Sequence, residues 1–129
     1  MSYFLSKNLK NNTVDSAIAR VTELLKEEGF GIISNINIAD TLKKKIDVDF
    51  KEYHILGACN PHFAHKALLS EDKIGLLLPC NVVVVDQGDG NIEVSAIDPL
   101  ASMATVENAD LGEFALMVKS SLETVIKKL

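Results

Sequence analysis

The sequence predicts an α+β fold in which helices pack on one face of a mainly antiparallel sheet. Two observations lead to this prediction. Short runs rich in Val, Ile and Phe alternate with longer segments whose apolar residues recur every three or four positions, in the order β-α-β-β-α-β-β-α. An Asp-Gly pair at 89–90 lies between two of the short runs, and this pair favours a hairpin between antiparallel strands. A chain of 129 residues is expected to form a single domain over 1–129.

The first elements form a strand–helix–strand unit with short connections. Weak alternation of apolar and polar residues predicts a strand over 3–9. The helix that follows is capped by Asn12 or Thr13 and ends at Gly29, because glycine tolerates the left-handed conformation that commonly follows a helix. A strand rich in Ile and Phe is then expected over 30–38.

The next segment combines a short helix with a third strand. The helix is expected from Ile38 to about Ile46, with Asp40 available as its cap and with Leu42 and Ile46 facing the core. The strand is expected over 50–59, and its residues alternate between the two faces of the sheet.

A helix and a buried strand follow. Asn60 is a good N-cap, and Pro61 suits the first helical position because the N–H that it lacks has no helical partner there. This helix is expected to reach about Asp72. The apolar run 76–78 predicts a buried central strand, and the chain is expected to stay extended to Asp86.

The C-terminal part is a hairpin followed by a helix. The turn is expected at Gln87–Asn91 and the returning strand at 92–97. Asp98-Pro99 breaks that strand. Asp110 begins the last helix, with Glu113 as its capping-box partner.

Composition excludes two classes of partner. The net charge of -5, a single short basic run at 43–45 and the absence of Trp do not fit a nucleic-acid interface. The longest apolar run, 74–85, is too short and too interrupted to span a bilayer, and the N-terminus does not resemble a signal peptide. We therefore expect a cytoplasmic protein without nucleic-acid or membrane partners, in which two cysteines act as thiols, ligands or redox partners.

The candidate site lies where two Cys-Asn pairs adjoin prolines, in Cys59-Asn60-Pro61 and Pro79-Cys80-Asn81. Amide groups and one carboxylate at the ends of neighbouring strands favour a small polar ligand. The candidate ligand-binding residues are Cys59, Asn60, Pro61, Cys80, Asn81 and Asp98. Structural roles remain open alternatives, since Asn60 can cap a helix, Asn81 can fix a β-bulge and Asp98 can form a turn.

A metal site is a second hypothesis for the same stretch. Cys59, His62 and His65 have the spacing C-x2-H-x2-H, and Cys80 adds a fourth soft ligand of the kind that zinc or another transition metal accepts. The helical phase weighs against it, because His62 and His65 share a face opposite to the apolar residues and are expected to meet solvent.

Thiol chemistry is the third hypothesis, with Cys59 and Cys80 as a thiol-based oxidoreductase. Cys59 lies just before a helix, where the dipole and unpaired N–H groups lower a thiol pKa. The alternative is that both cysteines are small buried apolar residues. A purely structural interaction domain is a further possibility, and no motif of a conventional catalytic site appears. Whether the protein is an enzyme therefore stays open.

The segments LGACNP, IGLLLPCNVVVV and SAIDP, in this order and spacing, resemble the domain-of-unknown-function family 302 over essentially the whole chain. The resemblance implies a compact two-layer fold of small bacterial and archaeal proteins, often dimeric, with no established biochemical role. A homodimer is therefore expected. The matching positions are Gly57, Cys59, Asn60, Pro61, Gly75, Leu78, Pro79, Cys80, Asn81, Asp98 and Pro99. His62 and His65 fall outside them.

Overall fold

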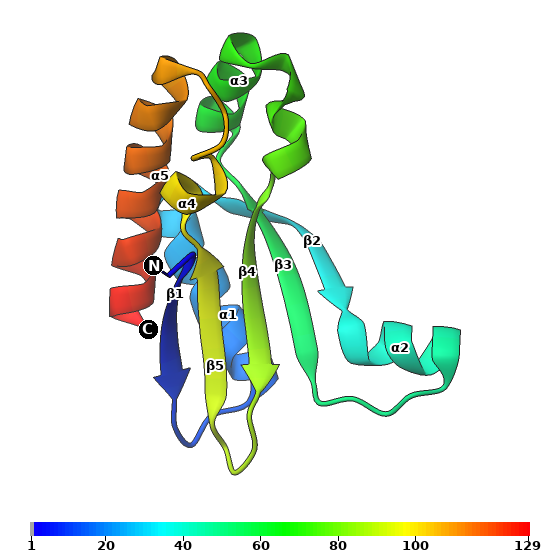
Figure 1. The fold of residues 1–129 in the computed structure, drawn as a ribbon. Coiled ribbons are helices and arrows are strands. Elements are labelled where there is room, and N and C mark those ends of the chain that lie inside the picture. The colour runs from blue at the N-terminus through cyan, green and yellow to red at the C-terminus, as the bar shows by residue number, and fades with distance from the viewer. Residues whose placement is uncertain (1) are drawn as a thin grey trace.

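The computed structural model describes residues 2–129 and confirms the α+β prediction (Figure 1). Five strands form one sheet in the order β1-β5-β4-β3-β2, and every neighbouring pair is antiparallel. The strands are β1 (Phe4–Leu9), β2 (Gly31–Asn37), β3 (Tyr53–Cys59), β4 (Cys80–Asp86) and β5 (Ile92–Ile97). The helices are α1 (Val14–Glu27), α2 (Ile38–Ile46), α3 (Pro61–Ser70), η1 (Asp72–Leu77, a 3-10 helix), α4 (Pro99–Ser102) and α5 (Ala109–Lys128).

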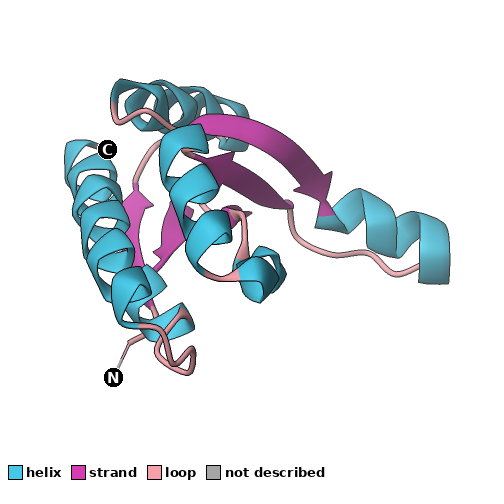
Figure 2. Cartoon of the chain, turned by 90° about the horizontal axis from the view of Figure 1, so that it is seen from above, coloured by secondary structure: helices cyan, strands magenta, loops and turns pink. Residues whose placement is uncertain are grey.

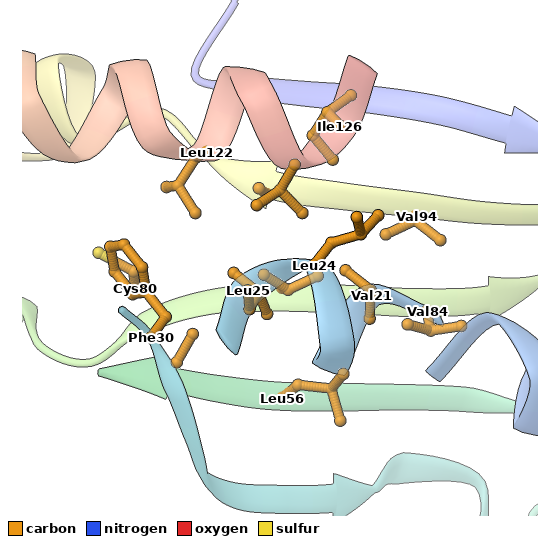
Figure 3. Close-up of a cluster of buried hydrophobic side chains, with 14 of the residues drawn as sticks. Val21, Leu24, Leu25, Phe30, Leu56, Cys80, Val84, Val94, Leu122 and Ile126 are labelled. Carbon is orange, nitrogen blue, oxygen red and sulfur yellow. The ribbon is translucent and has the colours of Figure 1, made fainter. Parts of the chain in front are cut away.

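The core lies between the sheet and helices α1 and α5, which cover the same face. In Figure 1, α1 runs behind the sheet and α5 lies beside β1. Alternate residues of the strands point toward these helices, and Figure 3 shows how they meet. The fully buried side chains include Val21, Leu25, Leu56, Val84, Val94 and Leu122. Burying each apolar side chain of this size contributes about 1.5–3 kcal/mol of transfer free energy.

Within the described residues 2–129, no helix covers the opposite face of the sheet (Figure 1). On β4 the alternation is clear: Cys80 and Val82 are buried toward the helices, whereas Asn81 is exposed and Val83 half-buried on the open face. We call this uncovered surface the open face. A concavity lies on this surface, as described below.

Local signals placed the starts of α1 and α3 and the β4–β5 turn well, whereas α5 begins at Ala109 with Asn108 as its cap and not Asp110. Thr13 caps α1, its side chain accepting a hydrogen bond from the Ser16 backbone N–H at 3.1 Å. Gly29 follows α1 with a φ of +84°. The β4–β5 turn contains Asp89 and Gly90 with φ of +56° and +77°, as the Asp-Gly pair predicts for a type I′ turn.

The prediction of a buried strand at 76–78 is wrong. This run belongs to η1 and the residue after it, and the Leu76 side chain is 85% exposed. Only Ile74 of η1 is buried. Strand pairing begins at Cys80, opposite Ala58, so residues before it have no neighbouring strand. A short apolar run does not by itself distinguish a strand from a helix.

The core-facing prediction for the helix at 38–46 is also wrong. The cap is Asn37, whose side chain accepts from the Asp40 N–H, and no residue of α2 is buried. Leu42 is half-buried and Ile46 is 63% exposed. Figure 2 shows α2 extending from the end of β2 away from the other helices. Periodicity predicts an apolar stripe but not the body against which it packs. The third strand begins at Tyr53 and not at residue 50, because 47–52 forms the return from α2.

No helix in the described part of the chain, residues 2–129, has both the length and the apolar character needed to cross a membrane.

Candidate functional site

The first Cys-Asn pair lies where β3 ends and α3 begins. Asn60 adopts an extended conformation, and its Oδ1 accepts hydrogen bonds from the N–H groups of His62 at 3.1 Å and Phe63 at 3.3 Å. Pro61 occupies the first turn, as expected. The Asn60 amide oxygen is therefore already engaged as a helix cap, and the capping alternative describes its role in this structure.

The second Cys-Asn pair is divided between the two faces of the sheet. Cys80 is 7% exposed and belongs to the core, beside Phe30 at one end of the cluster in Figure 3. Asn81, the next residue, is exposed on the open face. Consecutive residues of a strand point to opposite faces. The predicted ligand-binding set therefore does not converge on a single pocket.

The two cysteines line one small cavity between the ends of β3 and β4 and helices α3 and α5. Its volume is about 40 Å³. Its lining residues are Phe30, Ala58, Cys59, Asn60, Phe63, Ala64, Leu78, Pro79, Cys80 and Val118, and none of them carries a charge at neutral pH. Both thiols are free, Cys59 half-buried and Cys80 buried. Burial, with a smaller contribution from Cys59, raises the pKa of the Cys80 thiol to about 11.

The structure does not supply the activation predicted for Cys59. Pro61 has no N–H, and the N–H groups of His62 and Phe63 point to the Asn60 side chain. The Ala64 N–H donates to the Asn60 carbonyl at 2.9 Å. The first turn of α3 therefore retains no unpaired donor for a thiolate.

The proposed metal ligands do not come together. Residues 2–129 contain no group of three or more His, Cys, Asp or Glu side chains that could hold a metal ion. His62 and His65 are exposed on α3, as the helical phase predicts, whereas Cys80 is in the core. The C-x2-H-x2-H spacing fails as a metal motif here because it places the imidazoles on the outer face of the helix.

Asp98 has two protein partners. Its Oδ1 accepts from the Leu100 N–H at 3.0 Å, which caps α4, and its Oδ2 lies 2.9 Å from Lys119 Nζ of α5. The Asp98 side chain is 11% exposed and that of Lys119 28%. This largely buried ion pair connects the end of β5 to α5, so the carboxylate is engaged within the fold.

A larger concavity lies on the open face, across β1, β5, β4 and β3. Its volume is about 310 Å³. Aromatic side chains at two sides, Tyr3, Phe4 and Tyr53, surround a floor of aliphatic residues. The full lining is Tyr3, Phe4, Lys51, Tyr53, Asn81, Val83, Val85, Gln87, Glu93, Ser95, Ala96 and Ile97. Asn81 is the only residue of the predicted ligand-binding set that lies here.

Polar groups stand at both ends of this concavity. At one end, Lys51 Nζ donates to Gln87 Oε1 at 3.0 Å, and Gln87 Nε2 donates to Glu93 Oε1 at 3.3 Å. At the other end is the exposed Asn81 amide. Asn81 and Val85 are separated by four positions of β4, so the floor extends roughly 13 Å at about 3.3 Å per residue.

Comparison with known proteins identifies the family and supports the fold. The model of the family described as domain of unknown function DUF302 matches residues 5–129. The chain belongs to the DUF302 family. It is also similar to a structure entitled "Crystal structure of uncharacterized conserved protein DUF302 from Bacillus stearothermophilus", with a TM-score of 0.88 and 26% sequence identity over 98% of each chain. No curated protein matches it.

Sequence reasoning missed most of the concavity in this DUF302 chain. Its residues come from four strands that are distant in sequence, so they form no contiguous motif like those adjacent to the cysteines. One signal was present: Val82–Val85 is apolar on both faces of β4, although helices were expected on only one face. Such a run indicates that the second face also contacts something apolar.

Proposed function

We propose that this DUF302 protein binds a small, elongated and largely apolar molecule that carries a polar or anionic group, in the concavity of the open face. The observation that carries the proposal is the concavity itself. Its volume of about 310 Å³ falls at the lower end of the range for ligand sites, about 300–1,000 Å³, and its lining combines aromatic walls with a few polar groups.

The polar groups favour a ligand with a defined orientation. The Lys51 ammonium has three donors, and one of them is used by Gln87. The hydrogen bond to Gln87 holds the ammonium at the end of the apolar floor, where it is available to a carboxylate, sulfonate or carbonyl oxygen. The Asn81 amide offers a donor and an acceptor at the other end.

The cavity between the cysteines has less support as a ligand site. Its volume of about 40 Å³ suits a water-sized molecule, and its lining is apolar apart from Asn60 and the thiols. The remaining polar candidates, Asn60 and Asp98, serve as helix caps. The small-molecule hypothesis is therefore moved from the two cysteine junctions to the open face.

Binding of the dye 1-anilinonaphthalene-8-sulfonate tests the proposal, because its rings match the apolar floor and its sulfonate matches Lys51. We expect saturable fluorescence enhancement by the folded protein. Val83→Trp, which fills the floor, should abolish most of it, and Lys51→Gln should weaken binding several-fold, about the loss of one charge-assisted hydrogen bond.

The control is Leu76→Ser, which removes an exposed apolar side chain from η1, outside the concavity. This variant should bind the dye as the original protein does. Enhancement that is unchanged in Val83→Trp and Lys51→Gln, or lost in Leu76→Ser, would contradict the assignment of the site.

A homodimer is part of the same proposal, with two copies packed through their open faces. Tyr3, Phe4 and Phe50 are 65%, 42% and 47% exposed. Since an aromatic side chain presents about 150–250 Å², these three leave roughly 300 Å² of apolar surface in water. A stable interface needs about 800 Å² per partner, and these aromatic side chains would supply part of that area. The ligand would then lie between the two copies.

Light scattering after size-exclusion chromatography tests the dimer. Phe4→Asp should shift the mass from two chains to one, and Leu76→Asp on η1 should leave it unchanged. A monomeric mass for the unsubstituted protein refutes the dimer without affecting the ligand site. A cytoplasmic location also belongs to the proposal, supported by the two free thiols.

A further inference from the structure

The two cysteines are close in the sheet as well as in the cavity that they share. Ala58 and Cys80 are direct partners in the β3–β4 ladder, and Cys59 follows Ala58. With strands about 4.8 Å apart and a rise of about 3.3 Å per residue, the Cα atoms of Cys59 and Cys80 lie roughly 6 Å apart. Disulfides form at Cα separations of about 4.4–6.8 Å.

Both cysteines line the same cavity, at the point where β3 ends. Cys59 is the last residue of β3, and the chain turns at Asn60 into α3. Cys59 and Cys80 both line the cavity of about 40 Å³, and the charge of Cys59 is near enough to raise the pKa of Cys80. No other cysteine exists in the chain, so neither thiol has a competing partner within the molecule.

The two cysteines differ in their exposure to solvent, and the small cavity limits the size of a reagent that can enter it. Cys59 is half-buried, whereas Cys80 is buried. A cavity needs about 10–15 Å³ to hold a water molecule, so about 40 Å³ admits a reagent only slightly larger than water. Hydrogen peroxide meets this limit, whereas bulky thiol reagents and protein disulfides do not.

We propose that Cys59 and Cys80 are a peroxide-sensitive pair that closes an intramolecular disulfide between β3 and β4. In the first step the Cys59 thiolate attacks one peroxide oxygen, the O–O bond breaks, and hydroxide leaves as Cys59 becomes a sulfenic acid. In the second step the Cys80 sulfur attacks the Cys59 sulfur, the S–O bond breaks and water leaves. In total, two thiols lose two protons and two electrons, and peroxide is reduced to two waters.

The order of the steps follows from exposure and acidity. Cys59 meets the oxidant first because it is the more exposed thiol. Cys80 reacts second and slowly at neutral pH, because a thiol with a pKa near 11 is almost entirely protonated there. The proposal concerns a change in the protein's own state and needs no turnover of a substrate, and it does not depend on the ligand site of the open face.

Intact-mass analysis tests the pair after hydrogen peroxide treatment, followed by unfolding and alkylation of the remaining thiols. We expect a monomeric chain that has lost the mass of two hydrogen atoms, accepts no alkyl group, and regains two alkylatable thiols after reduction. The Cys59→Ser protein should retain an unmodified Cys80. The Cys80→Ala protein should form a sulfenic acid at Cys59, detectable with a dimedone probe present during unfolding.

Three results would overturn the proposal. In the first, Cys59 gains oxygen atoms while Cys80 remains alkylatable. In the second, Cys59 forms a disulfide between two chains. In the third, both thiols are unmodified after treatment. Should Cys80→Ala fold poorly, the mass analysis of the unsubstituted protein still decides among these outcomes. Circular dichroism of each variant establishes that the comparison is made on folded protein.

Discussion

Gly57 is the glycine with the closest neighbours to an added Cβ, and replacing it with alanine should destabilise the protein. It is paired with Ser34 on β2 and with Asn81 on β4. A Cβ at this position would collide with the Ser34 Oγ and lie 2.9 Å from the Pro79 Cγ. The Ser34 hydroxyl can rotate away, but the Pro79 ring is part of the chain and cannot. The strain must therefore be taken up by movement of β3 against β4.

The expected magnitude combines two opposing effects. Inserting a methyl group into a packed site costs about 1–3 kcal/mol. Replacing glycine within a strand by alanine recovers about 0.5–1 kcal/mol of backbone entropy. The free energy of unfolding should fall by about 1.5 kcal/mol, which lowers Tm by roughly 6 °C in a chain of this size.

Urea unfolding followed by circular dichroism measures the change, and the chain offers a matched control. Gly31 on β2 has no heavy atom within 4 Å of an added Cβ, so Gly31→Ala should leave stability unchanged or slightly raised. Ser34→Gly combined with Gly57→Ala should recover only the part of the loss that comes from Ser34. If Gly57→Ala is as stable as Gly31→Ala, the packing argument for Pro79 is refuted.

Three further predictions concern the ion pair, the buried thiol and the cap. Lys119→Met should lower stability by about 2–3 kcal/mol, because it leaves the Asp98 carboxylate without its partner, and adding Asp98→Asn should recover part of the loss in thermal unfolding. The pKa of Cys80 is raised from 9.0 to about 11, so the folded state favours the neutral thiol. The stabilisation from this thiol should be complete below pH 9. As the pH rises to 11 it should be lost, and the free energy of unfolding should fall by about 2–3 kcal/mol. The difference between the unsubstituted protein and Cys80→Ala over that pH range isolates this contribution, and a constant difference would contradict it. Asn60→Ala should cost about 1 kcal/mol in urea unfolding and Asn60→Asp much less, whereas equal losses would exclude the capping role.

The features that sequence predicted well depend on neighbouring residues. Thr13 and Asn60 cap helices, and Asp89-Gly90 forms its turn, because each acts on backbone groups within three positions. The outward direction of His62 and His65 also followed from the phase of a single helix.

The features that sequence reasoning missed depend on which elements become neighbours. Leu76 has apolar neighbours in sequence, but no strand pairs with it, and it ends exposed. Asn81 and Cys80 are adjacent in sequence and lie on opposite faces of one strand. The concavity of the open face joins Tyr3 to Tyr53 across four of the five strands, and only the strand order brings them together. A contiguous motif was therefore a poor guide to the site.

The position of α2 has a consequence for the construction of the chain. The β2–β3 ladder continues to the pair Asn37 and His54, so these strands are already adjacent where the excursion begins and returns. A two-residue Asn-Gly turn suffices to join two antiparallel strands. Residues 38–52 therefore add nothing that the hairpin topology requires, and a chain with this segment replaced by such a turn should still assemble the sheet and core. The segment is an insertion that the folding of a single copy does not require.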